Sequence, residues 1–479
     1  MNRSGDGLRL ALMRPAVVAL SRALPYLPER LLLRFIYRFV STVPYPGGRY
    51  FLSRMFYVAQ KVLSTRSVNC RNKVIYNFLG NSIVLGHARR MRFEEEEGFQ
   101  PPYFLVVSPT MRCNLNCYGC YAGSYTKKDD LETEVVDDIM RQSKELGMYF
   151  MTFSGGEPFI RQDILDLAAK HNDMYFQVYT NGTLIDEKMA DKLVELGNVF
   201  PAISVEGFKK ETDERRGPGA FEKITGAMDR LKERGVPFGF SATVTRENNE
   251  FVVSEEFVDF YMQKGCLLGW YFNYIPIGRK PDLSLMPTPE QRIYRLERLR
   301  ELRKTRPILL ADFWNDGPLV GGCIAGGRRY LHINAKGDVE PCVFIHFAVD
   351  NIKEKSLLDI LRSDLFKEIR RRQPYSKNYL RPCMIIDNPY ILRQVVAKCG
   401  AHATHPGGET VITELKDALD NYARRYAEIA DKVWQEEYLT DGKRLYADIP
   451  SRDEATKRLQ GRARAGLPGA SDFHQYTLF

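Results

Sequence analysis

A regular alternation of short apolar segments and amphipathic segments runs through the middle of this chain and restricts its fold more than any other feature. The amphipathic segments predict helices at 132–146, 164–169, 186–196 and 221–234. The apolar segments predict six strands, at 103–109, 149–154, 175–180, 200–205, 237–245 and 267–275. Such βα repetition is typical of an α/β fold with a parallel sheet, whose functional groups lie at the carboxyl ends of the strands.

Three closely spaced cysteines, Cys113, Cys117 and Cys120, follow the first predicted strand. Three thiolates at this spacing can hold three irons of a cubane and leave the fourth iron open, whereas cubanes usually take four cysteines. Close cysteine spacings also bind zinc, which is the alternative. The chain has nine cysteines and no clean signal peptide, which argues against a disulfide framework and for a reducing, cytoplasmic compartment.

A second motif, Ser154-Gly155-Gly156-Glu157-Pro158, follows the second predicted strand. Together with the cysteine run it resembles the radical SAM superfamily, over roughly residues 100–400. The resemblance implies a partial (β/α)6 TIM-type barrel and an enzyme whose three cysteines hold a [4Fe-4S] cluster. The open iron of such a cluster binds S-adenosylmethionine (SAM), and one electron then produces a 5′-deoxyadenosyl radical that abstracts a substrate hydrogen.

The same resemblance implies the residues around the cofactor. Gly155, Gly156 and Glu157 match the family's GGE motif, which faces the methionine ammonium. Ser204 ends the fourth predicted strand and Arg216 lies in an Arg-Gly stretch, positions that contact the ribose or the carboxylates of SAM in relatives; a helix cap and a surface arginine are the alternatives. The family usually has an aromatic residue near the adenine directly before the third cysteine, but this chain has Gly119 there. No protein side chain is predicted to be catalytic.

A second metal site is predicted from the C-terminal cysteines. Cys323, Gly337 and Cys342 follow the pattern C-x13-G-x4-C, which resembles the opening of SPASM/Twitch auxiliary-cluster domains. A hairpin turning at Lys336-Gly337 brings its flanking cysteines together. The full seven-cysteine array is absent, so we predict one auxiliary [4Fe-4S] cluster, with structural zinc as the alternative. Its predicted ligands are Cys323, Cys342, Cys383 and Cys399, and an uncoordinated Cys399 would leave one iron open to substrate.

The N-terminal part carries a separate signal. Residues 1–92 hold sixteen Lys and Arg against two acidic residues, whereas the whole chain has a net charge of +9. Arg30, Arg34 and Arg38 fall on one face of a predicted helix, which suits an anionic membrane interface. A helical cap on the barrel is the alternative, and no nucleic-acid motif is present. We expect a cytoplasmic protein, with peripheral contact of residues 1–92 with the inner face of the membrane.

These observations divide the chain into a basic helical extension (1–100), the barrel (101–282), a linker with the cluster domain (283–405) and a C-terminal helix and tail (406–479). A lipid or other hydrophobic substrate is favoured by the basic N-terminus and by the apolar sixth strand. A peptide or protein substrate, as in maturases of ribosomal peptides or sulfatases, is the alternative and rests on the SPASM resemblance. A non-catalytic metal-binding scaffold is a third reading. The implied redox partner is an electron donor of the flavodoxin or ferredoxin type.

Overall fold

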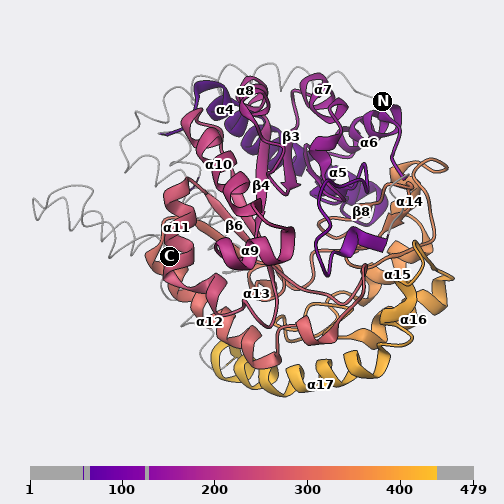
Figure 1. The fold of residues 1–479 in the computed structure, drawn as a ribbon. Helices are drawn as coiled ribbons and strands as arrows, with labels where there is room; N and C mark the ends of the chain where they lie inside the picture. Colours follow the sequence, from indigo (N-terminus) through magenta and orange to yellow (C-terminus); the bar gives the residue numbers. More distant parts are fainter. Residues whose placement is uncertain (1–57, 59–64, 125–128, 440–479) are drawn as a thin grey trace, which may run out of the picture.

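The structure is a computed structural model that describes residue 58 and residues 65–124 and 129–439. Its central element is one sheet of nine strands. Their order is β7-β6-β5-β4-β3-β2-β1-β8-β9, and all neighbours are parallel except β8 and β9. The sheet forms a partial barrel surrounded by helices, as predicted (Figure 1). The strands are β1 Phe104–Val107, β2 Phe150–Phe153, β3 Tyr175–Thr180, β4 Val199–Val205, β5 Gly239–Val244, β6 Leu268–Asn273, β7 Leu309–Asp312, β8 His332–Ile333 and β9 Val339–Glu340.

Helices follow most of the parallel strands. The predicted helices are confirmed as α6 Thr133–Glu145, α7 Asp163–Lys170, α8 Glu187–Leu196 and α10 Ala220–Glu233, and the structure adds α9 Lys209–Arg216 and α11 Glu255–Lys264. Helix α12, Pro289–Thr305, lies in the predicted linker, where the sequence indicates one helix over the same residues. Short helical turns lie at the strand ends and loops: η3 Tyr121–Ser124, η4 Pro158–Ile160, η5 Phe251–Val253, η6 Leu283–Leu285 and η7 Gly408–Val411. Strand β7 lies beyond residue 282, so the sheet continues past the boundary that the sequence suggests for the barrel.

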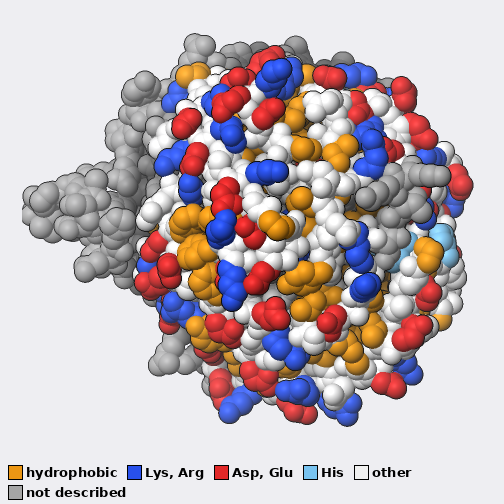
Figure 2. Space-filling view, in the orientation of Figure 1, with side chains coloured by type: hydrophobic (Ala, Val, Ile, Leu, Met, Phe, Trp, Pro, Cys, Tyr) orange, Lys and Arg blue, Asp and Glu red, His pale blue; other side chains and the backbone are white. Residues whose placement is uncertain are grey.

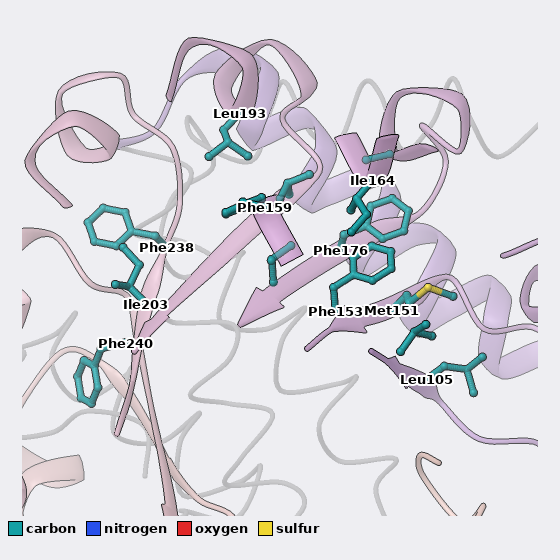
Figure 3. Packing of buried hydrophobic residues seen from close by; sticks show 14 of the residues in the cluster. Leu105, Met151, Phe153, Phe159, Ile164, Phe176, Leu193, Ile203, Phe238 and Phe240 are labelled. Atoms are coloured by element: carbon teal, nitrogen blue, oxygen red, sulfur yellow. The ribbon is translucent and has the colours of Figure 1, made fainter. Parts of the chain in front are cut away.

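The main hydrophobic core fills the space between the outer face of the sheet and these helices (Figure 3). Phe153 of β2 and Phe176 of β3 stack there with ring centroids 5.7 Å apart. Ile203 and Phe240 continue the layer on β4 and β5, and Ile164 and Leu193 meet it from α7 and α8. Each such side chain contributes roughly 1.5–3 kcal/mol when fully buried, so this layer holds the strand ends in register.

A long helical segment closes the amino end of the barrel. It consists of α4 Val68–Lys73, η2 Val74–Leu85 and α5 Gly86–Glu97. Its Phe78 packs on Phe150 and Tyr175, the first residues of β2 and β3, with centroid distances of 5.4 and 5.6 Å. For residues 65–97 the structure therefore shows the helical cap that the sequence left as an alternative. The basic helix around Arg30, Arg34 and Arg38 lies outside the described residues.

Amide and guanidinium groups of this cap bind the ends of the barrel helices. Asn69 donates to the carbonyls of Val194 and Glu195 at the end of α8, and Asn77 donates to that of Asn172 beyond α7. Arg89 donates to Lys144 O in the last turn of α6. Because the last carbonyls of a helix have no partner within the helix, these donors satisfy them and attach the cap to the barrel.

The C-terminal part continues the barrel sheet through the predicted hairpin. Its first strand, β8, pairs with β1 through Val106 and Val107, and the chain turns at Lys336-Gly337 into β9. Helices α14, α15, α16 and α17 then follow one another around one side of the molecule (Figure 1). The remaining elements are α13 Gly317–Val320, β10 Phe347–Ala348, α14 Leu357–Leu361, α15 Asp364–Arg372, α16 Pro389–Cys399, β11 His402–Ala403, α17 Lys416–Val433 and η8 Trp434–Leu439.

The described surface is of mixed polarity. Lysine and arginine side chains alternate with acidic ones over the face shown in Figure 2, and hydrophobic side chains appear between them in small groups. Within residues 65–124 and 129–439, no helix combines the length and the apolar character needed to cross a bilayer.

Candidate active site

The first cysteine triplet lies at the carboxyl end of β1, where barrel folds place their sites. Cys113 Sγ accepts the N–H of Leu115 at 3.4 Å and the amide of Asn181, from the end of β3, at 3.8 Å. Burial raises the pKa of the Cys113 and Cys120 thiols. The thiols of Cys117 and Cys120 raise the pKa of Cys113 further, and that of Cys117 raises the pKa of Cys120. The structure therefore brings the three predicted ligands together, in surroundings that favour thiolates only when a cation binds them.

The donor set fits a cubane, in which each thiolate binds a different iron. Three neighbouring thiols with N–H donors aimed at sulfur, on a loop of half-buried residues, match the needs of such a cluster.

The glycines of the GGE motif pack directly against the cysteine loop. Gly155 and Gly156 have no room for a side chain, because a Cβ would lie 2.4 Å from Thr110 O and 2.1 Å from Arg112 O respectively. Backbone bonds join the two segments, from Gly156 N to Thr110 O at 2.9 Å and from Glu157 N to Arg112 O at 2.8 Å. The contacts present thus require glycine for loop-to-loop packing. Their predicted contact with SAM stays a prediction.

Glu157 is fully buried and ties the end of β2 to the end of β3. Its Oε1 accepts from Phe159 N at 3.1 Å and from Thr180 Oγ1 at 2.8 Å, and its Oε2 accepts from Asn181 N at 2.7 Å. Burial raises the pKa of this carboxyl to about 7, although these donors oppose the shift. Both oxygens are engaged with the protein, so in this arrangement Glu157 positions Asn181, whose amide reaches Cys113.

Ser204 and Arg216 lie farther along the same rim. Ser204 Oγ is 3.3 Å from Ser241 Oγ, on the neighbouring strand. Arg216 binds the buried Glu206 through Nε at 3.1 Å and Nη2 at 2.5 Å. Arg215 pairs with the same carboxylate at 2.6 Å. Burial alone would lower the pKa of Arg215, but Glu206 and the thiols of Cys117 and Cys120 raise it overall. Both arginines therefore pair with Glu206, and Arg215 also lies beside the cysteine triplet.

The segment after β6 wraps the other side of the cysteine loop. Arg279 donates its backbone N–H to Cys120 O at 3.1 Å, and its guanidinium binds the Asn116 side chain. The ring of Tyr274 occupies the space beside Gly119, where a Cβ would lie 2.8 Å from the ring. The glycine that departs from the family pattern thus makes room for an aromatic ring from the residue that follows β6.

Aromatic side chains line the barrel interior at this end. Tyr179 of β3 and Phe272 of β6 touch at 5.5 Å although their strands are not neighbours, so both point inward. Phe344, two residues after Cys342, lies 6.3 Å from Phe272 and 5.9 Å from Tyr121. Because Tyr121 directly follows Cys120, the segment that carries a C-terminal cysteine meets the first cysteine loop at the barrel mouth.

The structure brings three of the four predicted auxiliary ligands together. After burial, the thiols of Cys323 and Cys383 are the groups that raise the pKa of Cys342. Burial also raises the pKa of Cys323 to about 11 and that of Cys383 to about 12. Donors point at the sulfurs, from Phe344 N and Tyr330 Oη to Cys342 and from Ile385 N to Cys383. This donor set fits an iron–sulfur cluster.

Cys399, the fourth predicted ligand, is not brought to this group. It ends α16, and its Sγ lies 3.7 Å from Asp364 O at the start of α15. The charged groups that act on its thiol are Glu368, Asp364, Lys398 and Arg372, with no other cysteine among them. The set of four thus separates into a cluster of three and one residue on a neighbouring helix.

Several residues of the site carry no sequence signal of their own. Only the fold brings four of them to the cysteines: Arg215, Tyr274, Arg279 and Tyr330. Asn181 differs, because it belongs to the run 180–183 at the end of the third predicted strand, which the sequence predicts to line the cofactor pocket, with a simple turn as the alternative. The position of Arg215 could have been suspected, since it precedes the predicted Arg216. Tyr330 is predicted only as part of the hairpin.

Two family models match the chain at these sites. The model of the radical SAM superfamily matches residues 107–258, and that of an iron-sulfur cluster-binding domain, SPASM, matches residues 323–384. The second match contains Cys323, Cys342 and Cys383 and ends before Cys399. The models therefore cover the two cysteine groups that the structure assembles.

The chain is also similar to curated relatives and to a solved structure. The chain is 30% identical to an Fe-coproporphyrin III synthase of Methanosarcina barkeri, over 58% of this chain and 79% of the relative. It is 28% identical to a PqqA peptide cyclase of Granulibacter bethesdensis, over 54% and 74%. The SAM-bound structure of SuiB from Streptococcus suis superposes with a TM-score of 0.52 at 20% identity, over 61% of this chain and 73% of that one, which shows a shared fold.

Proposed function

This chain belongs to the radical SAM superfamily and carries its SPASM iron–sulfur domain, and on that premise we propose that it oxidises a peptide or protein substrate. As an enzyme of this superfamily it uses [4Fe-4S] clusters and SAM. The sequence favoured a lipid and kept a peptide as the alternative. The relatives give no support to a lipid, whereas the PqqA peptide cyclase supports the alternative.

The observation that carries the proposal is the position of Phe344. This side chain follows Cys342 by two residues and contacts both Tyr121, beside the first cysteine loop, and Phe272, inside the barrel. A substrate at the barrel mouth would therefore lie between the two cysteine groups. That arrangement suits an oxidation in which hydrogen leaves toward one group and an electron toward the other.

When bound, the cofactors supply homolytic chemistry. An external electron cleaves SAM to methionine and a 5′-deoxyadenosyl radical, and this radical takes a hydrogen atom from the substrate and leaves as 5′-deoxyadenosine. The chain holds and shields this chemistry. Asn181 and the loop N–H groups orient the cysteines, while Arg215 and Arg279 place positive charge beside Cys120. Tyr179, Phe272 and Phe344 exclude water from the barrel interior.

A tetrapyrrole substrate is the second candidate. It is favoured by the 30% identity to the Fe-coproporphyrin III synthase, which extends over 317 residues. We also propose an electron donor of the flavodoxin or ferredoxin type and a cytoplasmic location. Membrane contact through residues 1–92 is a further proposal, and the basic helix that suggests it, around Arg30, Arg34 and Arg38, lies outside the described residues.

The test is anaerobic incubation of the holoenzyme with SAM, a reductant and one of three probes. The probes are synthetic peptides from short reading frames beside its gene, an iron tetrapyrrole from which Fe-coproporphyrin III can be formed, and liposomes of anionic phospholipid. We expect a peptide to stimulate 5′-deoxyadenosine formation and to lose two hydrogens, a mass loss that Cys342→Ala should abolish. Stimulation by the tetrapyrrole alone would favour the second candidate, and stimulation by liposomes alone would restore the lipid hypothesis.

A further inference from the structure

The side chain of Tyr330 forms a hydrogen bond with the sulfur of Cys342, one of the auxiliary cysteines. It directly precedes Leu331 and strand β8 and is only 1% exposed. Its hydroxyl lies 2.9 Å from Cys342 Sγ. Backbone N–H groups also donate to these sulfurs, among them Phe344 N to Cys342 at 3.5 Å and Ile385 N to Cys383 at 3.3 Å.

The direction of this bond follows from the chemistry of the site. A cysteine binds iron as a thiolate and then has no proton to give, so the phenol must donate. Hydrogen bonds to the sulfurs are among the factors that set the reduction potential of an iron–sulfur cluster. Reduction adds negative charge that is shared by the sulfurs, and a donor to a charged acceptor forms a stronger bond than a donor to a neutral one. The Tyr330 bond therefore favours the reduced cluster.

Packing fixes the hydroxyl in this position. The Tyr330 ring stacks on Phe104, the first residue of β1, at 5.3 Å with an interplanar angle of 8°. Its edge meets Phe313 at 6.0 Å, and Phe313 in turn contacts Phe272 of the barrel interior at 5.3 Å. Tyr330 thus lies between Cys342 and the barrel, with a ring that its neighbours hold on more than one side.

We propose that Tyr330 is a positioning residue that raises the reduction potential of the auxiliary cluster through its bond to Cys342, and so makes that cluster an electron acceptor. The electron would come from the substrate radical left after hydrogen abstraction. This radical gives one electron to the cluster and one proton to solvent, so the substrate loses two hydrogens in all. Only this last step rests on the proposed function. The effect of Tyr330 on the potential does not depend on the identity of the substrate.

The test is a redox titration of the holoenzyme, followed by electron paramagnetic resonance with SAM present to identify the catalytic signal. We expect Tyr330→Phe to shift the auxiliary midpoint to a more negative potential while the catalytic midpoint stays unchanged. Tyr375→Phe is the matched control, because Tyr375 lies near the same three thiols but its hydroxyl pairs with Gln373 Nε2 at 3.3 Å. Its auxiliary midpoint should equal that of the wild type.

Three results would overturn the proposal. An unchanged auxiliary midpoint potential in Tyr330→Phe would show that the Tyr330 hydroxyl has no effect on the cluster. Equal shifts in Tyr330→Phe and Tyr375→Phe would show that general packing, and not the bond to Cys342, sets the potential. Loss of auxiliary iron in Tyr330→Phe alone would make the tyrosine a requirement for cluster retention. None of these measurements uses a substrate, so failure of the peptide hypothesis would leave a shifted potential standing.

Discussion

The hydroxyl of Tyr121 lies 2.7 Å from Ser154 Oγ and accepts the N–H of Gly155 at 3.3 Å. These two bonds join the residue after the last catalytic cysteine to the loop that holds the GGE motif. Burial raises the pKa of this phenol to about 12, so it keeps its proton over the physiological range. The cysteine loop and the glycine loop are therefore held as one unit by a side chain that the sequence places beside Cys120.

Removing this hydroxyl should weaken SAM binding without removing iron. Tyr121→Phe keeps the ring contacts with Phe344 but loses both bonds, each of which contributes on the order of 1 kcal/mol. We expect several-fold weaker SAM binding, measured by anaerobic equilibrium dialysis, with unchanged iron and sulfide. Tyr118→Phe is the control, because the Tyr118 side chain is 43% exposed. This variant should bind SAM with the affinity of the wild type. Equal affinity in both variants would contradict the role of Tyr121.

Glu157 should make the stability of the fold depend on pH in a definite direction. Its pKa is raised from 4.5 to about 7, so the folded state binds this proton more tightly than the unfolded state. The contribution is present below pH 4.5 and is lost as the pH rises through 7, by up to about 3 kcal/mol. Urea unfolding at pH 5, 6, 7 and 8 should show this loss in the wild type.

Glu157→Gln isolates the effect, because glutamine does not titrate. At pH 5 the variant should have a lower free energy of unfolding than the wild type. Glutamine has an NH2 group in place of one carboxylate oxygen, and this group cannot accept the Asn181 N–H that the carboxylate accepts at 2.7 Å. Its deficit relative to the wild type should then shrink between pH 5 and pH 8. A deficit that stays constant with pH would show that Glu157 titrates normally in the fold.

The auxiliary cysteines should separate into two kinds. Cys399 lies against Asp364 and Glu368, so Cys399→Ala should keep the wild-type iron and sulfide content. Cys342→Ala removes the thiol at the centre of the group and should lose about half of the iron, as expected when one of two four-iron clusters is gone. Iron analysis with absorption spectra measures both. Loss of iron in Cys399→Ala would restore the four-cysteine ligand set.

The sequence predicted those parts of the fold that have a local pattern. The six parallel strands are found because each is an apolar run, and α10 is found because its apolar residues recur on one face. Helix α9, Lys209–Arg216, consists almost entirely of charged residues and has no such face, while β7, Leu309–Asp312, ends in an aspartate and follows the six predicted βα repeats. Propensity alone could not have identified either element.

At the candidate site, too, the sequence predicted only what has a local pattern. Cysteine spacing identified seven candidate ligands, but spacing cannot show that Cys399 faces α15. Asn181 lies 68 residues beyond Cys113, and only the pairing of β1, β2 and β3 in the sheet brings the two together. Tyr330 and Cys342 flank the hairpin β8–β9, whose existence was predicted but whose side-chain directions were not.

The contact between Gly119 and Tyr274 yields the last prediction. Gly119 has a φ of +61°, and an alanine Cβ there would lie 2.8 Å from the Tyr274 ring. Gly119→Ala therefore combines backbone strain of about 1–2 kcal/mol with a steric overlap, and it should lose catalytic iron to a chelator faster than the wild type. Gly400→Ala is the matched control, because φ is +62° and no atom lies within 4 Å of its Cβ position. The control should lose stability without faster loss of catalytic iron.

A second substitution separates the two causes. Tyr274→Ala in the Gly119→Ala background removes the overlap but leaves the strain, so the double variant should lose catalytic iron more slowly than Gly119→Ala alone. Partial recovery of this kind would show that Tyr274 occupies the space beside the glycine. If the double variant loses iron as fast as Gly119→Ala, backbone strain alone explains why glycine stands before the third cysteine.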